Sequence, residues 1–163
     1  MKNQELMIIK QAIINEIEGY EFYNMAESKA NSPEVKSAFL ELAAEEMQHV
    51  IWLKDLFNKL KEDNVVDFQL ALISEPTSPA IFKWENIDRK DAAIAVSVFG
   101  IGMQMEKASI EYYVKAAKET SLIEARELYN ILVKWEKVHF EKFSSQYEEL
   151  KEEWWSEQGF APF

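Results

Sequence analysis

The chain has 163 residues, 48% of them hydrophobic, and a formal net charge of −11. This length and apolar content predict one folded domain with a substantial core, while the negative charge argues against nucleic acid and anionic membranes as partners. The sequence contains no cysteine, which excludes disulfides, thiolate zinc sites, iron–sulfur clusters and a cysteine nucleophile within these residues.

No stretch of the sequence predicts a membrane span or a secretion signal. The longest nearly apolar run, residues 92–103, is too short to cross a bilayer. The first residues enter a helical pattern directly and lack the apolar run of a signal peptide. We therefore expect a soluble, cytoplasmic protein.

Hydrophobic periodicity predicts four long helices, and only four Gly and four Pro are available to interrupt them. They cover about residues 3–29, 33–62, 88–118 and 121–153. Ser32, Asp88 and Ser121 are the expected N-terminal caps. Residues 64–87 form a long connection, with a short helical piece near Asp67–Ile73. The links between the first and second helices and between the third and fourth are short, whereas the link between the second and third is long. This order indicates an all-α, four-helix bundle with one long crossover.

An aromatic tail follows the predicted bundle domain of residues 1–153. Residues 154–163 contain Trp154, Trp155, Phe160 and Phe163. These side chains either dock on a second subunit or fold back over the end of the bundle, because an apolar tail is unstable in water. We expect a homo-oligomer, with a dimer favoured.

Each predicted helix carries one glutamate near the middle of its apolar face, and two helices add a histidine one turn later. The second helix shows the pattern well, since Glu46 and His49 lie between Leu42 and Leu53 at helical spacing. The six residues are Glu16, Glu46, His49, Glu106, Glu136 and His139.

The two halves of the chain repeat this pattern, so the bundle is predicted to be built from two helix pairs. An offset of 90 residues relates Glu16 to Glu106, Tyr23 to Tyr113, Glu46 to Glu136 and His49 to His139. The same offset excludes Glu18, which maps to Ala108, and Glu45, which maps to Trp135. Glu21 does have a repeat mate, but it points well away from the stripe and is interpreted as a surface residue.

Four inward-facing carboxylates require compensating charge. An unpaired buried charge costs several kcal/mol, whereas a whole domain is stable by only about 5–15 kcal/mol. No Lys or Arg lies near these positions on the same stripes. The alternative is that the glutamates are solvated and the histidines are ordinary core residues. Two divalent cations would balance four carboxylates beside two neutral imidazoles, so we predict a dinuclear metal site.

The Glu, Glu-x-x-His, Glu, Glu-x-x-His layout resembles the ferritin-like di-iron carboxylate proteins. Within that superfamily the chain is most similar to the rubrerythrin branch, through "EIEGYEFY" and "EEMQH" and their second copies. The resemblance implies two metal ions per chain, most often iron, with Mn or Zn also suited to the ligands.

The resemblance also implies a role for each residue. Glu46 and Glu136 would bridge the metals, Glu16 and Glu106 would each bind one of them, and so would His49 and His139. Tyr23 and Tyr113 would hydrogen-bond to ligand carboxylates of the opposite helix pair. The alternative for the tyrosines is ordinary aromatic packing.

The function implied by the resemblance is an oxidoreductase that reduces peroxide or O₂ at the same six residues. Electrons would come from an external donor protein, because the chain lacks the cysteines of a rubredoxin-like domain. Rubrerythrins carry a further Glu one turn after the third-helix ligand, and here that position is Ser109, with Gly19 as its repeat mate. Two alternatives therefore stay open: a ferroxidase that handles or stores iron, and a non-catalytic bundle that binds Zn or Mn.

Overall fold

The computed structural model describes residues 2–31, 33–70, 73–74, 76 and 89–157. Its elements are α1 (Lys2–Lys29), α2 (Pro33–Lys61), the 3₁₀ helix η1 (Val65–Asp67), α3 (Arg89–Glu119) and α4 (Ile123–Glu157). No strand occurs within these described ranges. The predicted all-α class and the four long helices are confirmed, with most helix ends within two residues of the prediction.

One predicted helix end is wrong. The fourth helix continues to Glu157, four residues beyond the predicted end at Glu153, so the first residues of the expected tail belong to its last turn. The expected short helical piece is present as 3₁₀ turns at Val65–Asp67 and at Leu70, whose carbonyl accepts a hydrogen bond from the Ile73 N–H. The predicted caps Ser32 and Asp88, and tail residues 158–163, lie outside the described residues.

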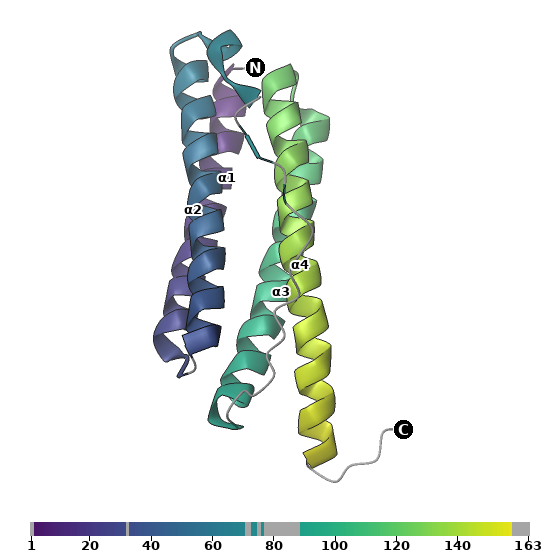
Figure 1. Ribbon diagram of the computed structural model, residues 1–163. Coiled ribbons are helices and arrows are strands. Elements are labelled where there is room, and N and C mark those ends of the chain that lie inside the picture. The colour runs from purple at the N-terminus through teal and green to yellow at the C-terminus, as the bar shows by residue number, and fades with distance from the viewer. Residues whose placement is uncertain (1, 32, 71–72, 75, 77–88, 158–163) are drawn as a thin grey trace.

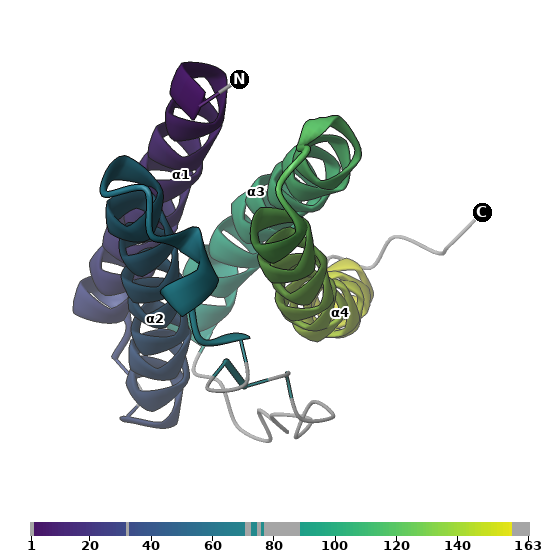
Figure 2. The same cartoon turned by 90° about the horizontal axis from the view of Figure 1, so that it is seen from above.

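The helices form two closely packed pairs, α1 with α2 and α3 with α4 (Figures 1 and 2). Within each pair the helices run in opposite directions, while α2 and α3 run the same way (Figure 1). The end of α2 at Lys61 and the start of α3 at Arg89 therefore lie at opposite ends of the bundle, as the predicted crossover requires. This is a four-helix bundle built from two helix pairs.

The apolar core divides into two clusters along the bundle axis. The first contains Ile9, Ala12, Leu53, Leu56, Tyr113, Leu128 and Leu132. The second contains Tyr23, Ala26, Phe39, Leu42, Phe99 and Phe143. On every helix the predicted metal ligands fall between the two sets in sequence, so a polar layer separates the clusters. Each fully buried large side chain contributes roughly 1.5–3 kcal/mol, and these clusters hold the layer in place.

A buried carboxylate outside this layer is also paired. Glu5 of α1 accepts hydrogen bonds from the hydroxyls of Tyr129, at 2.8 Å, and Thr120, at 2.7 Å. Thr120 Oγ1 also accepts from the backbone N–H of Leu122, just before α4 begins. These bonds fix the end of α3 and the start of α4 against the first turns of α1.

None of the helices described here carries an apolar stretch long enough to cross a membrane.

Candidate metal centre

The six predicted ligands come together in one buried layer. Helix α1 supplies Glu16 and α3 supplies Glu106, while α2 and α4 each supply a Glu and a His one turn apart. The three-residue spacing places both side chains of each Glu-x-x-His on the same helix face. All six residues are at most 3% exposed.

The six residues form two overlapping groups of four. One group is Glu16, Glu46, His49 and Glu136, and the other is Glu46, Glu106, Glu136 and His139. Within each group one donor atom per residue lies within 4.8 Å of all the others. Because Glu46 and Glu136 belong to both groups, their carboxylates are placed to be shared by two neighbouring ions.

Both imidazoles present Nδ1 to the carboxylates. His49 Nδ1 lies 3.0 Å from Glu16 Oε2 and 3.3 Å from Glu136 Oε1. His139 Nδ1 lies 3.2 Å from Glu46 Oε1 and 3.6 Å from Glu106 Oε2. The two rings stack at a centroid distance of 5.9 Å. Each ring therefore offers Nδ1 as the donor and directs Nε2 away from the centre.

Two of the atoms that could bind a metal in this layer lack a hydrogen-bond partner. Glu136 Oε1 and His139 Nδ1 are buried and make no hydrogen bond to any described residue. His49 Nδ1 lies close to the first atom and Glu46 Oε1 lies close to the second, but neither contact is a hydrogen bond. Buried polar atoms are nearly always paired, so this arrangement fits lone pairs that converge on a cation. Mixed carboxylate oxygen and imidazole nitrogen suits Fe, Mn or Zn.

Tyr23 and Tyr113 lie where the resemblance implied. The Tyr23 hydroxyl donates to Glu106 Oε1, and the Tyr113 hydroxyl donates to Glu16 Oε1. Burial raises the pKa of both phenols, and the facing carboxylates raise it further. Both hydroxyls therefore keep their protons and act as donors that orient the two non-shared glutamates.

Sequence reasoning missed Glu45 beside the centre, whereas the small residue expected at Gly19 lies there. Glu45, set aside because its repeat mate is Trp135, lies with Oε2 2.8 Å from His139 Nε2. Gly19 lies against Glu46: a Cβ at Gly19 would come within 3.3 Å of the Glu46 carboxyl carbon. The sequence did contain a signal for Glu45, because this residue directly precedes the ligand Glu46. Adjacent residues on a helix point about 100° apart, so Glu45 can reach towards a neighbouring helix beside the centre.

The centre retains protons when no metal is bound. Burial raises the pKa of Glu16 and Glu106, and neighbouring carboxylates raise it further. Burial alone would lower the histidine pKa, but carboxylate charges, led by Glu16 for His49 and Glu106 for His139, raise it well above the ordinary 6.5. A metal ion must therefore displace protons from these side chains.

The bundle and its layer of four carboxylates and two imidazoles define a ferritin-like protein with buried side chains that could hold metal ions. A family model described as Rubrerythrin matches residues 7–147, which include all six residues of the layer and both tyrosines. The chain belongs to the rubrerythrin family. No curated protein and no solved structure gives a significant match.

The shared and non-shared carboxylates are expected to respond differently to substitution. Glu46→Ala should lower metal content to about one ion per chain or less, because Glu46 belongs to both groups of four. Glu16→Ala should leave about one ion, since Glu16 belongs to one group. Metal analysis of purified protein measures this, with exposed Glu18→Ala as the control. Two ions retained in Glu46→Ala would contradict the ligand assignment.

Metal affinity should increase with pH. The histidines and the two non-shared glutamates bind protons more tightly in the folded, metal-free chain than in water, so protons compete with the metal at lower pH. Calorimetric titration with Mn²⁺ between about pH 6 and 8 should show this rise, with proton release that depends on the ionisation enthalpy of the buffer. A binding heat that is the same in all buffers would mean that no protons are displaced.

Proposed function

We propose that the chain is a di-iron carboxylate oxidoreductase that reduces peroxide, or O₂, with electrons from a separate donor protein. The sharing of Glu46 and Glu136 between both groups of four supports this most directly, because the same two carboxylates could then contact two neighbouring ions. Two iron ions bound there would supply one electron each, so that H₂O₂, two protons and two electrons give two waters.

The chain's own residues contribute positioning and exclusion of water. Glu46 and Glu136 lie between the two positions, and Tyr23 and Tyr113 orient the non-shared carboxylates. The two apolar clusters close the layer on both sides, which strengthens electrostatic interactions inside it. This environment favours charge changes at a fixed centre over loss of the ions to water.

Further proposals concern partners and place of action. We propose an external electron donor, because no cysteine is present to hold an iron centre of the rubredoxin type. A cytoplasmic location belongs to the same proposal.

We also propose a homo-oligomer, with a dimer favoured. Helices α1 and α2 expose Met7, Ile14, Met25, Leu40 and Ile51, each at least 48% accessible, which a second copy would cover. Sedimentation velocity of the full chain should give a species larger than 19.1 kDa. A single monomeric boundary at high protein concentration would rule this proposal out.

A ferroxidase or iron-handling function is the second candidate. The observation that favours it is the absence of a further carboxylate beside Glu106 and Glu16, where Ser109 and Gly19 stand. A six-ligand centre of this kind suits oxidation of incoming ferrous iron as well as peroxide reduction. A non-catalytic Zn or Mn role remains the third.

Stopped-flow absorbance distinguishes these functions. Protein loaded anaerobically with Fe(II) is mixed with peroxide in one experiment and with O₂ in another, and Glu46→Ala serves as the control. We expect much faster oxidation by peroxide. Faster oxidation by O₂ that continues with excess Fe(II) would instead establish the ferroxidase, and no oxidation by either would leave the non-catalytic role.

A further inference from the structure

The two histidines of the centre differ in what their outer nitrogens meet. His139 Nε2 lies 2.8 Å from Glu45 Oε2, and Lys142 Nζ lies 3.7 Å from the same oxygen. His49 Nε2 is buried and has no hydrogen-bond partner among the described residues. One imidazole therefore has a carboxylate on its outer side, and the other does not.

The internal repeat gives the reason for this difference. The repeat mate of Glu45 is Trp135, and the repeat mate of Lys142 is Trp52. The charged pair beside His139 is thus replaced by an indole pair beside His49. The centroids of both indole rings lie 5.5 Å from that of His49.

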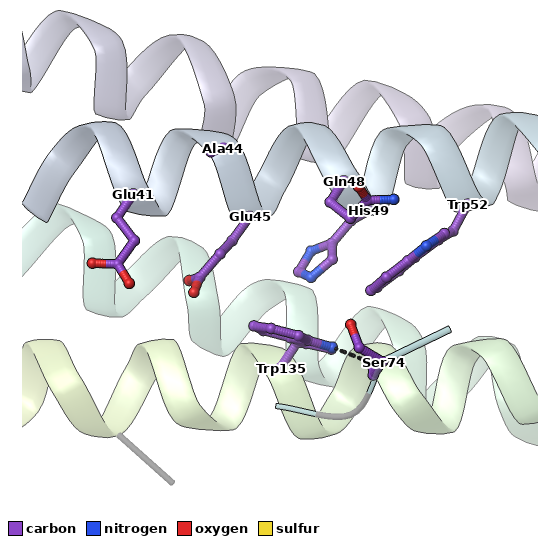
Figure 3. Close-up of a pocket in the computed structure, with 8 residues that line it drawn as sticks. All are labelled: Glu41, Ala44, Glu45, Gln48, His49, Trp52, Ser74 and Trp135. Atoms are coloured by element: carbon purple, nitrogen blue, oxygen red, sulfur yellow. Dashed lines mark hydrogen bonds between the residues drawn. The ribbon is translucent and has the colours of Figure 1, made fainter. Parts of the chain in front are cut away.

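The indoles cannot replace the missing carboxylate. An indole N–H is a donor only, and the one on Trp135 is already used by the backbone oxygen of Ser74, at 3.0 Å. A cavity of about 210 Å³ is lined by His49, both indoles and Ser74, and also by Glu45 (Figure 3). This volume has room for several waters, each of which occupies about 30 Å³ in the liquid. His49 Nε2 is therefore buried beside two indoles, with no anion among the described residues to accept its proton.

A carboxylate behind a metal-binding imidazole changes its affinity. When Nδ1 binds a metal, the ring proton stays on Nε2 and needs an acceptor. A carboxylate acceptor fixes the orientation of the ring and raises its basicity, and loss of such a partner typically costs 10–100-fold in metal affinity.

We propose that the two metal positions are unequal, with Glu45 as a positioning residue that makes the Glu106–His139 position bind a divalent ion more tightly than the Glu16–His49 position. This inference rests on the proposed dinuclear centre and concerns its order of filling. The second ion, at the imidazole that lies against the two indoles, is the exchangeable one.

Calorimetric titration of the metal-free full chain with Co²⁺ tests the proposal. Wild type should show two binding steps that differ at least about tenfold in affinity. Glu45→Ala should weaken the tighter step by about 10–100-fold, so that the two steps approach each other. Glu45→Gln should give an intermediate loss, because its amide oxygen still accepts the N–H but carries no charge.

Glu41→Ala is the matched control. Glu41 lies one turn before Glu45 on α2, lines the same cavity and is exposed. Its removal takes away the same charge from the same side of the centre and should leave both steps unchanged. The melting temperature of each metal-free variant checks that folding is preserved.

Proton NMR of the Co²⁺-loaded protein gives a second readout that a general structural defect would not reproduce. Wild type should show one shifted imidazole N–H that exchanges slowly with water, from His139, and this signal should exchange rapidly in Glu45→Ala. If Glu45→Ala leaves the tighter step unchanged, weakens both steps equally or weakens only the weaker step, the proposal is wrong. Two equal steps in wild type would also overturn it but keep the dinuclear centre, whereas failure to bind two ions would remove the centre itself.

Discussion

The dominant constraint on this bundle is the burial of four glutamate carboxyl groups in one layer, where ionised carboxylates repel one another. Desolvation of each charge costs several kcal/mol, and the two imidazoles can offset only part of it. The layer persists because apolar clusters on either side hold the helices at fixed positions. Two divalent ions would neutralise it, so the stability of the fold and the loading of the centre are coupled.

The polar contacts of the interior mainly join one helix pair to the other. Two tyrosines donate across the gap to Glu106 and Glu16, Glu5 of α1 accepts from side chains at the end of α3 and on α4, and Glu45 of α2 reaches His139 of α4. Apolar packing between helices tolerates sliding, but hydrogen bonds of this kind do so poorly. These contacts therefore set the register between the two helix pairs. That register also decides that Glu46 and Glu136 belong to both groups of candidate metal ligands.

Helical periodicity was sufficient to predict the fold and the ligand layer, because residues that share a helix face are determined by their spacing. The repeat then separated Glu46 from Glu45, although the two are adjacent in the sequence. It could not reveal that Glu45 contacts His139, since that contact depends on how α2 and α4 are placed in space. Glu5 was missed for the same reason: its partners lie more than a hundred residues away.

The end of the fourth helix was predicted too early because the sequence offers no strong stop signal there. Gly159 is the first glycine after Glu153, and Pro162 the first proline, so nothing before them prevents the helix from continuing to Glu157. The tryptophans at 154 and 155 were interpreted as part of a tail from composition alone. Apolar side chains at a helix end are equally compatible with a last turn.

The internal repeat keeps the same residue types at the predicted metal ligands, but not at the residues that contact the outer sides of the two histidines. This difference bears on the choice between the two candidate functions. A peroxide reductase must keep both ions through its cycle, whereas a protein that passes iron onwards must release at least one. Unequal positions would reconcile the two, because one ion would be held by His139 with Glu45 behind it, while its neighbour would be bound by an imidazole that lies against two indoles. The function of the centre would then depend on two times: how long an ion at His49 stays bound, and how soon an oxidant molecule reaches the centre.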